Sequence, residues 1–359
     1  MRILIVKLGS IGDIVHTLPS LAAIRRGLPN AEISWVVERG SAEILRDNPI
    51  LDRLIEVDTK ALRRGLMSGE TLRAPRQQLR RLRASAFDLA LDFQGLLKSA
   101  SIARLSGARR IYGFSREGLR EPPSRLLLSR TVSVPKQTHV IRKGLGLIAG
   151  ALDIAVPNDA RDFEFPIAVN GINQREAEEA AAETGGKYVI LNPGGGWPTK
   201  LWSAEKFGLL ADELWSHYGA TSLITYGPGE LELAETVMRA SRSGKARAVS
   251  LSLKGFYALA KKAQLYVGGD TGPTHLAIAA GTPVVGLFGP TEWWRNGSPR
   301  DEDICVERND IGCRTDCHRR SCSQWICMDI DVERVFQAVT ERLKRADKIP
   351  QVETVAITV

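Results

Sequence analysis

The stretch of sequence that indicates the fold is Ile3-Leu4-Ile5-Val6-Lys7, followed by Leu8-Gly9-Ser10-Ile11-Gly12-Asp13-Ile14. A short, continuous apolar run is typical of a strand that is buried on both faces of a parallel sheet. The glycines allow a ligand to approach the backbone closely, and Asp13 falls in the first turn of the helix expected next. Ligands of open α/β sheets bind at this carboxyl edge. The stretch therefore predicts a parallel α/β sheet with a binding site after its first strand.

Asp13 has two interpretations. Acidic residues are favoured near helix N-termini because they complement the helix dipole, which would be a purely structural role. An acid in the crevice at the end of a strand can also act on a substrate. The glycine spacing is not G-x-G-x-x-G, so the dinucleotide fingerprint of a dehydrogenase is absent here.

The alternation of short apolar runs with helical patterns continues along the chain, which is typical of parallel α/β layers. The expected strands are 3–7, 33–37, 54–57, 89–93 and 110–113 in the first half, and 188–192, 222–226, 248–251, 265–269 and 283–288 in the second. We therefore predict an α/β protein with two Rossmann-like domains that face each other.

The 359 residues are enough for two domains of similar size. Residues 154–171 are rich in Pro, Asp and Asn and show little periodicity, which favours a linker there. We expect an N-terminal domain over residues 1–165 and a C-terminal domain over residues 172–330. Residues 331–359 are expected to form a closing segment. In it, residues 331–344 form a closing helix and the last dozen residues form a loose tail.

The composition indicates an ordinary globular protein, with 43% hydrophobic and 25% charged residues. Neither a membrane-spanning run of about 18–20 apolar residues nor a signal peptide is recognisable, so we expect a cytoplasmic location. The net charge of +8 favours an anionic partner. Basic residues gather in 60–83 and 104–130, either as a binding face or as solvated helix surfaces.

Two loops of the second half have residues suited to phosphate. Gly194-Gly195-Gly196 follows an expected strand and precedes Lys200, which would suit a phosphate-cradling loop or a mobile surface loop. Asp270-Thr271-Gly272-Pro273-Thr274-His275 follows another strand, where the free N–H groups of a helix start could hold a diphosphate. His275 by itself is more typical of a core histidine than of a ligand.

Four of the five cysteines cluster, at Cys313, Cys317, Cys322 and Cys327. Their spacing lacks the C-x2-C pairs usual in structural zinc sites. We therefore expect no metal, with a four-thiolate zinc site as the alternative.

Taken in order, these pieces resemble glycosyltransferase family 9, the heptosyltransferases, with the type I enzymes as the nearest branch. The matching motifs are Met1–Lys7, Gly12-Asp13, His16–Pro19, Trp35–Glu38, Asp92–Ser99, Arg120–Pro122, Lys136-Gln137-x-His139, Lys200-x-Trp202, Asp270–His275 and Gly289–Thr291. The likeness extends over roughly residues 1 to 340, which is nearly the whole chain.

The resemblance implies the GT-B fold, with the acceptor in the N-terminal domain and the donor in the C-terminal one. It also implies inverting transfer of heptose from ADP-L-glycero-D-manno-heptose to Kdo-lipid A, in lipopolysaccharide inner-core biosynthesis, without a metal or another cofactor. The enzyme would lie at the cytoplasmic side of the inner membrane as a peripheral protein.

Roles follow for individual residues from the same resemblance. Asp13 would be the general base, and Lys200 would neutralise the leaving diphosphate. The donor-binding set would comprise Gly194, Gly195, Lys200, Glu230 near the ribose, Leu251 against the adenine, Asp270 at the sugar, Thr271, Gly272 and His275. Arg63, Arg64 and Arg120 would meet the acidic sugar and phosphates of the acceptor.

The chain also departs from the type I pattern. Glycines stand at 194–196 where type I enzymes have hydroxyl residues, and the cysteine cluster is more like type II and other members. A family 9 enzyme with another sugar or acceptor is therefore an alternative, as is a GT-B-like sugar-nucleotide epimerase. A nucleic-acid-binding protein finds no support, because no aromatic-interleaved basic motif or recognised binding module is present. The sequence makes no prediction of the oligomeric state.

Overall fold

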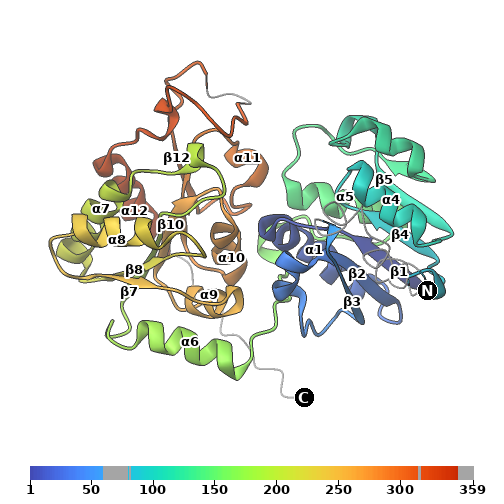
Figure 1. Cartoon of the computed structure of the whole chain (residues 1–359), viewed down its shortest axis with the longest axis horizontal. Coiled ribbons are helices and arrows are strands. Elements are labelled where there is room, and N and C mark those ends of the chain that lie inside the picture. The colour runs from blue at the N-terminus through green and yellow to red at the C-terminus, as the bar shows by residue number, and fades with distance from the viewer. Residues whose placement is uncertain (60–79, 81, 314–316, 347–359) are drawn as a thin grey trace, which may run out of the picture. The chain divides into compact units, whose positions relative to one another are not determined.

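The fold was analysed in a computed structural model, which describes residues 1–59, 80, 82–313 and 317–346 (Figure 1). The chain divides into two compact units. The first comprises Met1–Gly171 with Trp294–Pro299, and the second comprises Ile172–Trp293 with Arg300–Val359.

The first unit is a six-stranded sheet in the order β3-β2-β1-β4-β5-β6, and every pair of neighbouring strands is parallel. Its strands are β1 (Arg2–Val6), β2 (Glu32–Glu38), β3 (Arg53–Val57), β4 (Leu89–Asp92), β5 (Arg110–Phe114) and β6 (Arg130–Val132). The α-helices are α1 (Ile11–Gly27), α4 (Leu97–Leu105) and α5 (Val140–Leu152), and the 3-10 helices are η1 (Arg39–Leu45), η2 (Arg116–Gly118), η3 (Pro122–Leu127) and η4 (Ala160–Asp162).

The second unit is also a six-stranded parallel sheet, in the order β12-β11-β10-β7-β8-β9. Its strands are β7 (Tyr188–Asn192), β8 (Thr221–Thr225), β9 (Ala246–Val249), β10 (Leu265–Gly269), β11 (Val284–Phe288) and β12 (Ile304–Glu307). The helices are α6 (Gly171–Ala181), η5 (Pro198–Lys200), α7 (Ala204–Tyr218), α8 (Leu231–Ala240), α9 (Leu253–Ala260), α10 (Gly272–Ala280), η6 (Ile326–Met328) and α12 (Val332–Ala346), and the short α11 (Trp293–Asn296) is divided between the units.

The two sheets have the same topology. Counted from β1 and from β7, each has the order 3-2-1-4-5-6 of a doubly wound Rossmann sheet. The chain reverses its direction of travel between β1 and β4 in the first sheet, and between β7 and β10 in the second. Ligands of such sheets bind outside the carboxyl ends of the strands at this switch point. The topology therefore predicts where the functional residues of each unit should lie.

The helix α7 illustrates how the sequence forms the second unit. The Ser203 side chain accepts a hydrogen bond from the backbone N–H of Lys206 at 3.2 Å, which caps the helix start. Gly219 ends the helix in the left-handed region at φ 62°. Helix α7 packs against α8 and α12, while α9 packs against α10 on the other face of the sheet (Figure 1).

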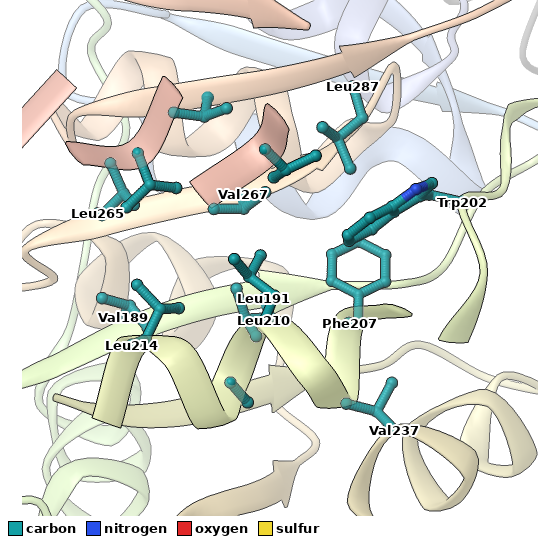
Figure 2. Close-up of a cluster of buried hydrophobic side chains, with 14 of the residues drawn as sticks. Val189, Leu191, Trp202, Phe207, Leu210, Leu214, Val237, Leu265, Val267 and Leu287 are labelled. Carbon is teal, nitrogen blue, oxygen red and sulfur yellow. The ribbon is translucent and has the colours of Figure 1, made fainter. Parts of the chain in front are cut away.

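The buried face of α7 contributes to the core of the second unit (Figure 2). Phe207, Leu210 and Leu214 are fully buried and meet apolar side chains of the sheet such as Leu191. Trp202 packs edge-on against Phe207, with the ring centroids 4.8 Å apart. Burying each large side chain stabilises the fold by about 1.5–3 kcal/mol relative to an exposed one.

The structure agrees with all ten expected strands to within a few residues at their ends. It adds two that the sequence did not predict, β6 and β12, which are the edge strands at one end of each sheet. Helix α12 matches the expected closing helix and packs against α7 and β12 of the second unit. None of the helices in the described part of the chain is long and apolar enough to span a membrane.

Candidate active site

Asp13 lies at the switch point of the first sheet, where β1 ends and α1 begins. Its Oδ1 is 3.0 Å from the ammonium of Lys7, the residue that follows β1. Its Oδ2 accepts a hydrogen bond from the backbone N–H of Ser10 at 3.0 Å. Asp13 thus closes the first turn of α1, as the structural interpretation expected. Its side chain remains 23% exposed, so the carboxylate is also partly accessible.

The Asp13 carboxylate is held in its ionised form. Burial raises the pKa of this group, but the ammonium of Lys7, the charge of Arg120 and the Ser10 N–H lower it by more, so the net pKa lies below its ordinary value. Lys7 itself is buried and also donates to the backbone oxygen of Phe93 at 3.3 Å. The site therefore presents a fixed carboxylate that is charged at neutral pH.

The loop before Asp13 is fixed by the neighbouring strand β4. The Gln94 side chain accepts from the N–H of Leu8 and donates to the oxygen of Gly9, both at 3.0 Å. Asp92 in turn accepts from the backbone N–H groups of Gln94 and Gly95, at 2.9 and 3.2 Å. Complete burial raises the pKa of Asp92. The sequence identified this segment only as a family motif and did not indicate its role as the support of the loop.

Of the three arginines expected at the acceptor, one is described. Arg120 lies after β5, where its backbone N–H bonds to the oxygen of Gly95 at 3.1 Å. Its charge is one of the groups that lower the pKa of Asp13, so it belongs to the same edge of the sheet. Arg63 and Arg64 lie outside the described residues.

Lys200, Asp270 and His275 come together at the switch point of the second sheet. Lys200 Nζ is 2.6 Å from Asp270 Oδ2, and His275 Nε2 is 3.2 Å from Asp270 Oδ1. All three side chains are largely buried. Burial raises the pKa of Asp270, but His275 and Lys200 lower it far more, so this carboxylate is ionised. Lys200 and Asp270 are 70 residues apart in the sequence, and the fold brings them together as one charged pair.

The glycine loop after β7 is closed by Glu230. The carboxylate of Glu230 accepts from the N–H of Gly195 at 3.0 Å and from the N–H of Gly227 at 2.8 Å. A Cβ added at Gly194 would lie 2.4 Å from the Glu230 carboxylate, so a larger residue here would displace that carboxylate from its present contacts. The Gly195 N–H, which the sequence placed in a phosphate-binding loop, therefore donates to an acidic side chain of the same unit.

The remaining expected donor residues surround this edge. Thr271 directly precedes α10, which begins at Gly272, and its hydroxyl lies 3.2 Å from that of Thr274. Thr274 is also 2.9 Å from the hydroxyl of Tyr266. Leu251 lies in the loop after β9 and is half-buried. The helix start at Gly272 stands at the end of β10, beside the charged pair of Lys200 and Asp270.

The cysteine-containing segment contacts the Lys200 loop. Thr199 donates its hydroxyl to the oxygen of Arg319 at 2.7 Å, and the Trp325 indole donates to the oxygen of Thr199 at 3.1 Å. Lys200 Nζ lies 4.3 Å from the ring centre of Trp197. The segment thus supports the loop that presents Lys200, which the sequence did not indicate.

The four clustered cysteines, for which a zinc site is the alternative, all lie among the described residues. Cys313 and Cys322 are exposed, whereas Cys317 and Cys327 are partly buried, and all four thiols are free. Within residues 1–59, 80, 82–313 and 317–346, no group of three or more His, Cys, Asp or Glu side chains is placed to hold a metal ion.

Each switch point therefore has its own chemistry. The first offers an ionised carboxylate that could accept a proton. The second offers a lysine ammonium, a helix start and a glycine loop, which together suit a diphosphate.

Comparisons with known proteins identify relatives that match most of the chain. Lipopolysaccharide heptosyltransferase 1 of Pseudomonas aeruginosa is 34% identical over 325 residues, which cover 90% of this chain and 88% of the relative. The enzyme of the same name from Escherichia coli K12 is 30% identical over 298 residues, covering 81% and 89%. Both names agree with the type I branch that the motifs favoured.

Solved structures agree with this assignment. The structure of E. coli heptosyltransferase WaaC with ADP superposes with a TM-score of 0.77 at 25% identity, covering 95% of this chain and 100% of WaaC. WaaC has also been solved with ADP-2-deoxy-2-fluoro heptose, with a TM-score of 0.76. The two parallel α/β units are those of a GT-B fold. The model of glycosyltransferase family 9 (heptosyltransferase) matches residues 76–326, and the chain belongs to this family.

Proposed function

We propose that this enzyme transfers heptose from ADP-L-glycero-D-manno-heptose to a Kdo-lipid A type acceptor, with inversion and without a metal, in the assembly of the lipopolysaccharide inner core. The support from relatives is the type 1 heptosyltransferase name and the ADP-bound structures of WaaC. The observation in this chain that carries the proposal is the arrangement of Lys200, Asp270 and the glycine loop at the second switch point.

In the proposed reaction Asp13 is the general base. Its carboxylate takes the proton of the acceptor hydroxyl while the hydroxyl oxygen bonds to the anomeric carbon of the heptose. The bond between that carbon and the diphosphate oxygen breaks, and ADP leaves with the electron pair. A positioned base typically contributes about 10²–10⁴ in rate. Lys7 fits this role because it keeps the Asp13 carboxylate ionised.

The second unit would stabilise the leaving diphosphate. Lys200 supplies a positive charge, and backbone N–H groups at Gly195, Thr271 and Gly272 supply hydrogen bonds. In the structure Lys200 is paired with Asp270, and the Gly195 N–H donates to Glu230. We infer that the donor exchanges these contacts, so that the diphosphate takes the ammonium, while the two carboxylates become available to hydroxyl groups of the sugar and the ribose.

Asp270, Glu230, Leu251 and His275 complete the proposed donor site. Asp270 would contact the heptose, Glu230 the ribose and Leu251 the adenine, while His275 holds Asp270 in place. The acceptor would lie at the membrane surface, to which the net charge of +8 would attract the protein as a peripheral enzyme.

The experiment that tests this function mixes the purified protein with ADP-heptose, with and without Kdo-lipid A, and measures released ADP and the mass of the glycolipid. We expect ADP release that requires acceptor, a glycolipid that is heavier by one heptose, and full activity in the presence of a chelator. ADP release without acceptor would indicate hydrolysis or an epimerase-type reaction. Tight ADP binding with no transfer would instead indicate a family 9 enzyme with another sugar or acceptor.

The role of Lys200 is tested by Lys200→Met. Loss of one charge-assisted hydrogen bond of about 1.5–3 kcal/mol should weaken ADP binding roughly ten- to a hundredfold in calorimetry. Lys187→Met, a change of an exposed lysine before β7, is the matched control and should leave the affinity unchanged. Equal ADP affinity in the Lys200 variant and the control would remove Lys200 from the phosphate site.

A further inference from the structure

Lys143 of α5 is a half-buried lysine to which neither the motifs nor the relatives assign a role. Its Nζ donates to the backbone oxygen of Gly118 at 2.6 Å and lies 4.5 Å from the ring centre of Phe114. Phe114 is the last residue of β5, and Gly118 belongs to the turn after it. The ammonium is therefore held at the carboxyl edge of the first sheet, which is the edge where Asp13 lies.

The packing of α5 against α1 supports this placement. The His139 ring, one turn before Lys143, lies 6.1 Å from the ring of His16, which is one turn after Asp13. A Cβ at Gly144 would lie only 2.9 Å from the Ser20 hydroxyl. The two helices are in close contact at these positions, and Lys143 lies next to them in the sequence, between His139 and Gly144.

Positive charge accumulates around Lys143. Burial, together with the charges of Arg295, Lys7 and Arg120, lowers the pKa of its ammonium to about 8. Arg295 belongs to the segment Trp294–Pro299, which is part of the first unit. The charged and titratable groups near Lys143 are thus the cations Lys7, Arg120 and Arg295, the histidines His16 and His139, and the carboxylate Asp13, which is paired with Lys7.

The excess of positive charge near Lys143 favours the binding of an anion. Asp13 forms an ion pair with Lys7, while the positive charges of Lys7, Arg120 and Arg295 all disfavour the charge of the Lys143 ammonium. Holding like charges together costs free energy, which the fold recovers when a ligand brings a negative group between them. An anion bound here would also stand beside the proposed base.

We propose that Lys143, together with Lys7, Arg120 and Arg295, forms a subsite for the carboxylate of the acceptor's acidic sugar. This inference rests on the proposed function and specifies which group of the acceptor is recognised next to Asp13. The carboxylate of the sugar is favoured over a lipid phosphate because it is carried by the same sugar as the reacting hydroxyl. Both groups can then meet one edge of one sheet, where the carboxylate is held by cations while the hydroxyl meets Asp13.

The test combines a change of the protein with a change of the acceptor. Transfer is measured for wild type, Lys143→Gln, Lys143→Arg and the control Lys187→Gln. Each is assayed with Kdo-lipid A and with the same acceptor after its sugar carboxylate has been reduced to a hydroxymethyl group. With the intact acceptor we expect Lys143→Gln to raise the acceptor KM about ten- to a hundredfold, with the donor KM unchanged. With the reduced acceptor, wild type and Lys143→Gln should have the same KM.

A pH series supplies a second readout. Lys143 loses its charge as the pH rises through its pKa of about 8, so the wild-type acceptor KM should rise above that pH. Lys143→Arg, whose guanidinium stays charged, should restore binding and remove this rise.

The outcomes separate the inference from the function. An unchanged acceptor KM in Lys143→Gln would overturn the subsite. An equal loss on intact and reduced acceptor would also overturn it, because the lysine would then serve a phosphate or the structure. Failure of the wild type to release ADP with either acceptor would overturn the proposed function, and this inference with it.

Discussion

Replacing Lys7 by methionine should change the pH dependence of the reaction. The side chain of Lys7 is 7% exposed, and its ammonium lies 3.0 Å from Asp13 Oδ1. Methionine fills similar space but has no charge. The Asp13 carboxylate would keep its hydrogen bond from the Ser10 N–H and lose its nearest counter-charge. Burial, the largest influence on the pKa of Asp13, would then be opposed less, and the pKa should rise.

The size of the change follows from the contact that is lost. A hydrogen bond between charged groups contributes about 1.5–3 kcal/mol, and about 1.4 kcal/mol corresponds to one pH unit in a titration, so losing this contact should raise the pKa of Asp13. In the wild type the pKa is lowered, so the base is ionised throughout the neutral range. In Lys7→Met the acid limb of kcat/KM should therefore move to higher pH by about one to two units.

The assay is ADP release at low acceptor concentration between about pH 4 and 8. Circular dichroism at each pH confirms that the variant is folded over that range. Lys187→Met is the control and should have the wild-type profile. An acid limb of Lys7→Met that coincides with that of the wild type would refute the coupling of Lys7 to the base. So would a uniform loss of rate with no displacement along the pH axis.

Two further predictions concern the second unit. Gly194→Ala would place a Cβ 2.4 Å from the Glu230 carboxylate, whereas a Cβ at Gly196 meets nothing within 4 Å. Gly194→Ala should therefore weaken ADP binding by about 1–3 kcal/mol in calorimetry while Gly196→Ala does not, and equal affinities would contradict the close packing of the loop. Arg342→Met removes a guanidinium 2.7 Å from the fully buried Asp303 carboxylate, so the free energy of unfolding in urea should fall by about 3–5 kcal/mol. Adding Asp303→Asn to that variant should recover part of the loss, and no recovery would mean that packing rather than charge causes it.

Much of the fold could be predicted because parallel strands buried on both faces leave a continuous apolar signal. The strand β1 is buried along Ile3 to Val6, and its sequence was recognisable for that reason. The strands β6 and β12 were missed because they stand at sheet edges and are partly exposed. The segment Arg130–Val132, for example, has no fully buried residue. Edge strands need no apolar run, so their sequence resembles that of a loop.

The positions of the site residues could be predicted from the sequence, but their contacts with one another could not. Because strand ends mark the carboxyl edge of a parallel sheet, Asp13, Gly194 and Asp270 could be placed there from the sequence. The pairing of Lys200 with Asp270 could not, since it joins two loops through the fold. Glu230 was assigned to the ribose by resemblance, and its bond to the Gly195 N–H was not foreseen.

Lys143 shows the same limit. It falls in a helical pattern that gives no sign of function, and only packing brings it to the carboxyl edge. The charges that surround a side chain depend on which turns and helices pack together. These contacts cannot be predicted from a single sequence.

The central claim is that Asp13 is the base of an acceptor-dependent heptose transfer. The most direct test measures ADP release from ADP-heptose with and without Kdo-lipid A, for wild type and Asp13→Asn. Asparagine can keep the shape of the side chain but cannot take the proton. We predict that the wild type releases ADP only with acceptor, and that Asp13→Asn binds ADP-heptose with unchanged affinity while its transfer rate falls by about 10²–10⁴. Wild-type turnover in Asp13→Asn would contradict the account.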